Sequence, residues 1–184
     1  MSSVPFHYVD LRTFAYATED EKRVEQALRA LLPDEYELER ETTAGFHGDR
    51  IVVLSARVEN ADDVRHVLSR LAELPDVDAV LADLDARVDE DCSLFLRLDK
   101  QAAFRDDVEL GAGISLRAKV EAYPAKREAA VENAREALAT LRDERERAGR
   151  GAEGADADAA GDGDDEGGEG DGDDEGGEAG EAGE

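Results

Sequence analysis

The sequence predicts an α+β fold, in which a mostly antiparallel sheet has helices packed mainly on one face. Segments with an apolar residue at every second position predict strands, and segments with one at every third or fourth position predict helices. These segments follow one another in the order β-α-β-β-α-α-β-β-α, and two helices in tandem suit packing on one face of a sheet. The other face should then be at least partly open.

The chain begins with a strand and a helix. Residues 7–17 alternate between small or apolar side chains and polar or aromatic ones, which predicts a strand. Thr18 and Glu21 then form a capping-box pattern at the start of a helix. Two further strands are expected over residues 36–43 and 50–58, because a glycine-containing turn separates two segments of strand character.

Two helices and a strand occupy the middle of the chain. Asn60 is a suitable cap for the second helix, and Pro75 ends it. The apolar spacing over residues 77–88 predicts a third helix directly afterwards. Leucines at every second position predict a strand over residues 94–99, and residues 100–105 are expected to form a short turn or helical piece.

The last strand and helix precede a tail of unusual composition. Residues 114–122 predict a strand with one buried and one solvated face, and Pro124 suits the first position of the final helix. After that helix, the chain contains only Asp, Glu, Gly and Ala, so it has no large apolar surface to bury. We therefore expect an α+β domain over residues 1–148 and a disordered acidic tail over residues 149–184.

The charge of the chain indicates both its environment and its ligand. The formal net charge is −26, and we attribute the excess of carboxylates to solubility in concentrated cytoplasmic salt. Two neighbouring stretches run against this acidity. Residues 92–105 carry three basic groups and one acidic group, a net of 3 − 1 = +2, and residues 114–127 carry four and one, a net of 4 − 1 = +3. Positive groups kept in an acidic chain suggest a site for a polyanion, with RNA as the leading candidate.

The candidate RNA contacts come from these two stretches and from the first strand. They are Arg12, Arg97, Lys100, Gln101, Arg117, Lys119, Lys126 and Arg127. The alternative is that these cations form a solvated strand face and pair with nearby carboxylates. Phe14 and Phe95 are interpreted as packing under a helix or loop, with stacking on single-stranded RNA as the alternative.

The sequence does not favour an enzyme. Its three histidines and its one cysteine, Cys92, lack metal-ligand spacing, and neither a phosphate-binding glycine loop nor a nucleophile elbow occurs. We therefore expect no catalysis, no cofactor and no metal. One cysteine cannot form an intrachain disulfide, and neither a secretory signal nor a membrane-spanning stretch stands out, so we expect a cytoplasmic protein.

Three segments carry a resemblance to a known family, and they are VDLRTFAYATEDEKRVEQAL, SLFLRLDKQAAF and ISLRAKVEAYPAKRE. Together with the pattern between them, they resemble the archaeal RNA-binding protein family described as a predicted exosome subunit. The resemblance implies a fold like that of the ribosomal protein that holds the small RNA of the large subunit. It also implies RNA binding without known catalysis and a tie to RNA processing or degradation.

These observations lead to one expected function and one alternative. We expect a non-catalytic RNA-binding protein, associated with the exosome, in a salt-adapted archaeal cytoplasm. Its partners would be RNA and exosome or ribosome-associated proteins. The alternative is a protein-interaction adaptor of an RNA-degradation or ribosome-associated complex, in which the same basic face docks an acidic partner.

Overall fold

The computed structural model describes residues 4–157, and its centre is one antiparallel sheet. The strands are β1 (Phe6–Ala15), β2 (Glu39–Ala44), β3 (Arg50–Val58), β4 (Ser93–Asp99) and β5 (Gly113–Val120). They lie in the order β2-β3-β1-β5-β4, and every neighbouring pair is antiparallel. The predicted fold class is confirmed, and the first strand lies at the centre of the sheet.

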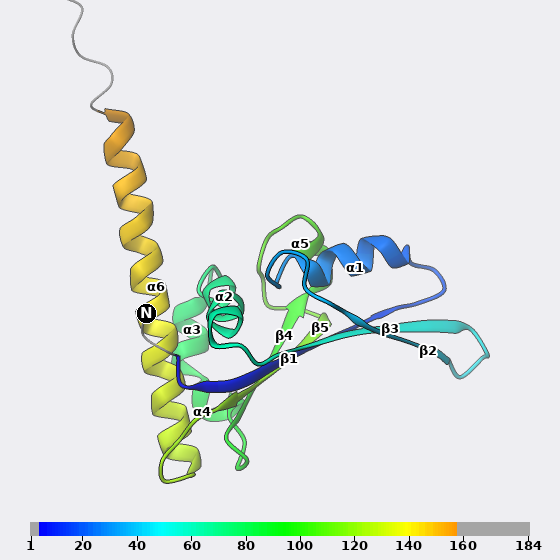
Figure 1. Cartoon of the computed structure of the whole chain (residues 1–184), viewed down its shortest axis with the longest axis horizontal. Coiled ribbons are helices and arrows are strands. Elements are labelled where there is room, and N and C mark those ends of the chain that lie inside the picture. Colours follow the sequence, from blue (N-terminus) through cyan, green and yellow to red (C-terminus); the bar gives the residue numbers. More distant parts are fainter. Residues whose placement is uncertain (1–3, 158–184) are drawn as a thin grey trace, which may run out of the picture.

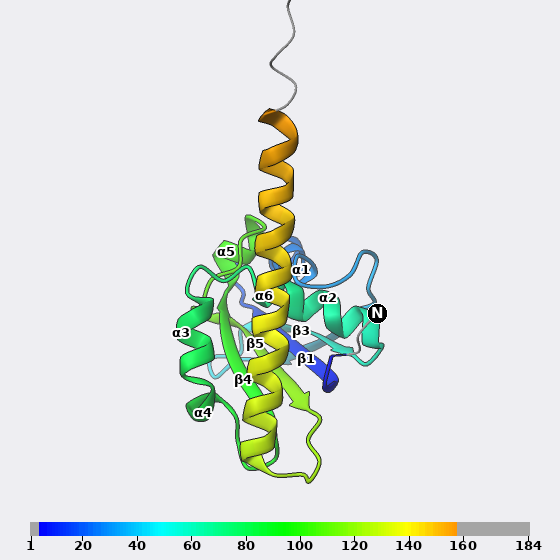
Figure 2. The same cartoon turned by 90° about the vertical axis from the view of Figure 1, so that its left-hand side faces the viewer.

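The helices gather on one side of this sheet (Figures 1 and 2). They are α1 (Glu21–Arg29), α2 (Ala61–Leu71), α3 (Val77–Ala82), α4 (Leu84–Arg87), α5 (Lys100–Phe104) and α6 (Arg127–Ala157). Figure 1 shows α1, α2 and α5 above the sheet, with α6 standing upright across one end. Within the described residues, no helix is both long and apolar enough to span a lipid bilayer.

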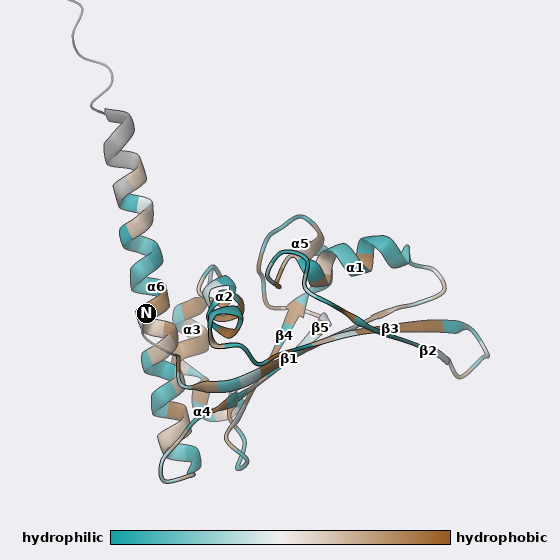
Figure 3. Ribbon diagram, in the orientation of Figure 1, coloured by the Kyte–Doolittle hydropathy of each residue, from teal (hydrophilic) through white to brown (hydrophobic). Residues whose placement is uncertain are grey.

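Alternation along the strands separates a buried face from an open one. Leu11 pairs with Ala56 on β3 and with Leu116 on β5, and Leu116 pairs with Leu96 on β4. All four side chains are buried, and direct cross-strand partners lie on the same face of a sheet. Apolar faces of α1, α2 and α6 pack over this side, and the hydrophobic parts of α2, α3 and the strands appear brown in Figure 3.

Glycines allow the chain to return closely from β4 to β5. Gly113 has a φ of +113°, and a Cβ there would lie 2.6 Å from the Cβ of Lys100. The buried hydroxyl of Thr13 on β1 donates a hydrogen bond to the Gly113 carbonyl at 2.7 Å. The start of β5 is therefore held between α5 and the central strand at a position that requires glycine.

The structure corrects the predicted start of the first helix. The N-cap is Asp20, whose side chain accepts hydrogen bonds from the backbone N–H groups of Lys22 and Arg23. Thr18 therefore does not form the predicted capping box with Glu21. The carboxylate of Glu21 pairs with Arg40 on β2 instead, so a tertiary contact takes the group that the local pattern assigned to the cap.

The later helices also differ from the expectation. The predicted third helix is divided at Asp83 into α3 and α4. The last helix starts at Arg127 rather than Pro124, because the Lys126 N–H bonds back to the Pro124 carbonyl in a tight turn. It continues to Ala157, beyond the predicted end of the domain at residue 148. The rest of the predicted tail, residues 158–184, lies outside the described residues.

Candidate nucleic-acid interface

The open face of the sheet, turned away from the helices, carries charged and aromatic side chains in register. Asp10 on β1 pairs directly with Arg57 on β3 and with Arg117 on β5. Arg117 in turn pairs with Phe95 on the outer strand β4. One row across four strands therefore presents Arg57, Asp10, Arg117 and Phe95 side by side.

A second row of side chains lies two residues further along β1 on the same face. Arg12 on β1 pairs with Ser55 on β3 and with Ser115 on β5, and Ser115 pairs with Arg97 on β4. Arg12, Ser115 and Arg97 are exposed. On the other side of β3, Ser55 pairs with Glu39. This second row therefore has an arginine on β4, another on β1 and a carboxylate on β2.

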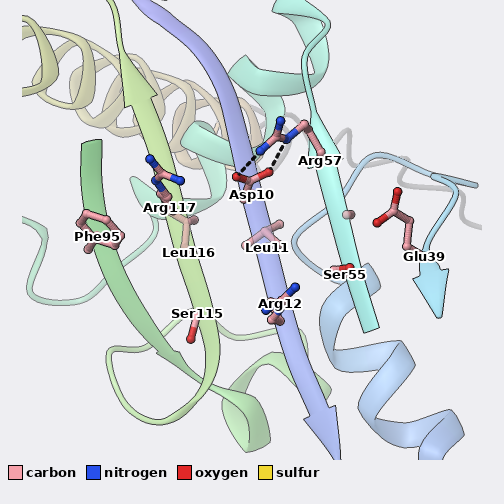
Figure 4. Close-up of a pocket in the computed structure, with 11 residues that line it drawn as sticks. Asp10, Leu11, Arg12, Glu39, Ser55, Arg57, Phe95, Ser115, Leu116 and Arg117 are labelled. Carbon is pink, nitrogen blue, oxygen red and sulfur yellow. Dashed lines mark hydrogen bonds and ion pairs between the residues drawn. The ribbon is translucent and has the colours of Figure 1, made fainter. Parts of the chain in front are cut away.

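The two rows enclose a shallow hollow of about 540 Å³ on the sheet surface (Figure 4). Its charged lining comes from Asp10, Arg12, Glu39, Arg57 and Arg117, with the Phe95 ring at one side. The rest of the lining comes from Leu11, Ser55, Ala56, Ser115 and Leu116. Such an open hollow fits a flexible polar chain laid across the sheet better than an enclosed small molecule.

Asp10 is held on one side of this hollow. Both of its carboxylate oxygens accept hydrogen bonds from Arg57, at 2.7 and 2.8 Å, as the dashed lines in Figure 4 show. The hydrogen bonds and the charge of Asp10 raise the pKa of Arg57. The Arg57 guanidinium also lies over the Tyr8 ring, 4.4 Å from its centroid. Arg57 is therefore positioned and neutralised by its neighbours.

Arg117 is positioned by neutral groups. Its Nε and Nη2 lie 3.4 and 3.3 Å from the Ser93 hydroxyl, and its guanidinium is 5.9 Å from the centroid of the Phe95 ring. Lys119, two residues further along β5, donates to the backbone carbonyl of Asp91. A hydroxyl, a ring and a carbonyl orient these cations without cancelling their charge.

Most cations elsewhere on the body are neutralised by carboxylates. Ion pairs hold Arg29, Arg40, Arg50, Arg57, Arg65, Arg70, Arg87, Lys100, Arg135, Arg142 and Arg150. Within residues 4–157, no ion pair involves Arg12, Arg97, Arg117 or Lys119. The cations that likewise form none in this range but lie on helices or in loops are Lys22, Arg23, Arg105, Lys126, Arg127, Arg145 and Arg147. The open sheet face thus gathers four unneutralised cations from three adjacent strands.

Two of the predicted contacts, Lys100 and Gln101, lie away from this face on α5. Lys100 is 8% exposed, and its ammonium lies 2.7 Å from a Glu19 oxygen and 2.9 Å from the Phe14 carbonyl. Burial alone would raise the pKa of Glu19, but hydrogen bonds from Lys100 and from the Tyr16 N–H, with the Lys100 charge, lower it overall. Lys100 thus ties α5 to β1 and the start of α1. Gln101 is exposed beside it.

The remaining predicted contacts, Lys126 and Arg127, lie beyond the end of β5. Lys126 is exposed in the turn that precedes α6. Arg127 donates to the carbonyls of Val88, at 3.0 Å, and of Asp85, so it joins α6 to α4. The structure therefore brings Arg12, Arg97, Arg117 and Lys119 together, and places the other four predicted residues elsewhere.

Residues that the sequence analysis missed complete the hollow. Arg57 lies outside both basic stretches, and its position on the open face follows from the β1–β3 register, which local sequence does not encode. Phe95 is 45% exposed on the open face. The favoured interpretation, that its ring packs under a helix or loop, is therefore wrong. Phe14 is partly buried and stacks against Tyr16 with ring centroids 6.3 Å apart.

Nothing in residues 4–157 resembles a metal centre, since no three His, Cys, Asp or Glu side chains there converge on a common point. Two carboxylates of the acidic runs at residues 89–91 and 106–107 have protein partners. Asp89 accepts a hydrogen bond from the Ser93 N–H, and Asp106 pairs with Arg70.

Comparison with known proteins shows the family to which the chain belongs. A family model described as RNA binding matches residues 8–120. The chain belongs to this family. A relative, the RNA-binding protein PAB1135 of Pyrococcus abyssi, is 35% identical over 143 residues, which cover 72% of this chain and 93% of the relative.

Solved structures of similar proteins agree with this family membership. Mth689 of Methanothermobacter thermautotrophicus, a DUF54 protein, is 40% identical, with a TM-score of 0.62 over 72% of this chain and 98% of its own. AF2318 of Archaeoglobus fulgidus is 28% identical, with a TM-score of 0.65 over 72% of this chain and 99% of its own. The region matched to the RNA-binding family starts in β1 and ends with β5, so it covers the sheet apart from the first two residues of β1 and does not include α6.

Proposed function

We propose that this chain binds RNA without catalysis, through the open face of its sheet. The observation that carries the proposal is the set of four cations from β1, β4 and β5 that share this face without ion pairs in the described residues. In a chain of net charge −26, most other cations meet a carboxylate. Family membership supports RNA as the polyanion that these groups bind.

The chemistry of the proposed contacts is phosphate capture. The arginines at positions 12, 97 and 117 offer planar forks that can donate two parallel hydrogen bonds to a phosphate, and Lys119 offers a compact charge. Arg117 and Lys119 are already oriented by neutral neighbours, so less side-chain freedom is lost when a phosphate arrives.

The proposed setting is RNA processing or degradation, in association with the exosome of a salt-adapted archaeal cytoplasm. The sequence resemblance and the acidic composition support it. At about 1 M ionic strength the Debye length is roughly 3 Å, so the overall negative charge would not repel RNA at a distance. Contacts on the open face would then decide binding.

The test is a triple substitution, Arg97→Ala with Arg117→Ala and Lys119→Ala. We expect RNA affinity to fall by tenfold or more, measured by fluorescence anisotropy in 0.15 M and about 2 M KCl. The control is Arg145→Ala with Arg147→Ala and Arg150→Ala, which removes the same charge from exposed positions on α6. Equal losses in both variants, or in neither, would contradict the proposal.

The adaptor alternative predicts a different result from the same purified protein. If the open face docks an acidic protein, the wild-type chain binds no RNA at either salt concentration, and the triple variant loses a protein partner instead. The exosome association is tested separately by gel filtration with a purified archaeal exosome, with and without RNA. Separate elution in both cases would refute that association and leave the RNA site unaffected.

A further inference from the structure

The charge on the open face is divided between its two sides. Over β4 and β5 lie Arg97, Arg117 and Lys119, whereas Glu39 and Glu41 of β2 occupy the opposite side through their pairing with Ser55 and Val53. Both glutamates are exposed. A polyanion on this face should therefore follow the β4–β5 side and avoid β2.

The spacing along β5 suits an extended polyanion. Ser115, Arg117 and Lys119 stand on the same side of one strand, so each step between them is about 6.6 Å. Neighbouring phosphates of an extended single strand are separated by a similar distance. Consecutive phosphates could thus meet a hydroxyl, a guanidinium and an ammonium in turn.

Phe95 lies beside this line of polar groups. Its ring is 45% exposed and is the direct cross-strand partner of Arg117. Exposed rings on an antiparallel sheet can stack on unpaired bases, and such stacking is sequence-tolerant because every base has a flat face. A backbone running along β5 would place its bases over β4, where this ring is.

A duplex fits the same face poorly. Double-stranded RNA is recognised through contacts to two backbones across a wide, shallow minor groove. With one backbone on β5, the second would lie toward β2, three strand intervals or about 14 Å away. There it would meet Glu39 and Glu41, which repel phosphates. The bases of a duplex are also stacked on one another and cannot stack on Phe95.

We propose that the ligand of this face is single-stranded RNA, with its backbone along β5 and a base stacked on Phe95. This inference rests on the proposed function and makes it more specific. It assigns Phe95 a binding role through stacking and Arg117 a double role. Arg117 would contact a phosphate while its guanidinium borders the stacked base.

The experiment compares a mixed-sequence 12-nucleotide RNA with the 12-base-pair duplex that contains it. Fluorescence anisotropy at several KCl concentrations gives the affinity and its salt slope. We expect the wild-type protein to bind the single strand at least tenfold more tightly than the duplex. Phe95→Ala should weaken single-strand binding by roughly five- to a hundredfold and leave the salt slope unchanged, because stacking releases no counterions.

Two further variants separate the ring from its bulk and from the charges. Phe95→Tyr keeps the ring and should retain binding, whereas Phe95→Leu keeps apolar bulk and should behave like Phe95→Ala. Lys119→Ala should reduce the magnitude of the salt slope by about 0.7, the value for one phosphate contact on a single strand. Circular dichroism of each variant checks that the fold is intact.

The outcomes distinguish this inference from the proposed function. If the wild-type protein binds neither RNA, the proposed function fails. The single-strand inference alone is overturned if the duplex binds as well as the single strand, or if folded Phe95→Ala and Phe95→Leu bind like wild type, while the triple charge variant still loses binding. In that case the open face binds RNA through phosphates without stacking.

Discussion

The carboxylate of Asp10 is held by both nitrogens of the Arg57 fork, at 2.7 and 2.8 Å, although Arg117 is its direct partner on the other side. Arg57 therefore neutralises the acidic group at the centre of the open face. The Arg117 side chain lies against a hydroxyl and a ring, and it forms no ion pair among the described residues, so its charge is not neutralised. If RNA binds to this face, as we propose, the charge of Asp10 should lower its affinity.

Replacing Asp10 should strengthen RNA binding. Asp10→Asn removes the negative charge from the hollow and frees the Arg57 fork for a phosphate, so we expect a several-fold gain in affinity at 0.15 M KCl and a steeper salt slope. Anisotropy titration measures both. Glu136→Gln is the matched control, because it removes one exposed negative charge from α6. An equal gain in the control would show a general charge effect.

Lys100 should matter for stability and not for RNA binding. Lys100→Met removes the partner of Glu19 and the donor to the Phe14 carbonyl in a largely buried site. We expect the free energy of unfolding to fall by about 2–4 kcal/mol in urea titrations. RNA affinity at 25 °C should stay within about twofold of wild type. A tenfold loss of RNA affinity in a folded variant would contradict this prediction and show that Lys100 contributes to RNA binding.

The Glu19–Lys100 pair should also give a defined pH dependence. The pKa of Glu19 is lowered in the folded state below its ordinary 4.5, so the folded form binds this proton less readily than the unfolded chain. The stability from this group is present above pH 4.5 and is lost as the pH falls through the lowered pKa. Urea titrations between pH 3 and 6 of wild type and Glu19→Gln should show a stability difference that shrinks toward low pH. A difference that is constant with pH would refute this account.

Gly113 should tolerate no side chain. Gly113→Ala combines a φ of +113° with a Cβ only 2.6 Å from the Lys100 Cβ, so we expect a loss of about 2 kcal/mol or more. Gly149→Ala is the opposite case, because a Cβ at that helical position meets nothing within 4 Å. It should be neutral or stabilise by up to about 1 kcal/mol. Thermal unfolding of both variants checks this contrast.

Local pattern was enough to predict which side chains of β1 face the core. Period-two alternation assigned Arg12 and Phe14 to one face of β1 and Thr13 to the other, as the structure confirms. It could not predict the strand order, because pairing between β1 and β5 joins residues about a hundred positions apart. The predicted cap at Thr18 was wrong for a related reason. Several adjacent acids could serve as caps, and distant partners decided their roles.

Charge counting along the chain found three of the four cations without ion pairs that the structure brings together on the open face. It identified Arg97, Arg117 and Lys119 because basic residues outnumber acidic ones in their two stretches of sequence. The same count included Lys100, whose carboxylate partner is 81 positions away. It missed Arg57, which reaches the hollow only through strand register. Local sequence therefore could not predict which cations are neutralised by carboxylates that are distant along the chain.

The central position of β1 has a consequence for how the protein is made. β1 leaves the ribosome before the other strands of the sheet, but one of its two hydrogen-bonded neighbours, β5, ends at Val120. At roughly 5–20 residues per second, the intervening hundred or so residues take about 5–20 s to synthesise. During that interval the nascent chain can hold β1 against β3 alone, with its other edge unpaired. Completion of the sheet must therefore wait until translation has passed β5.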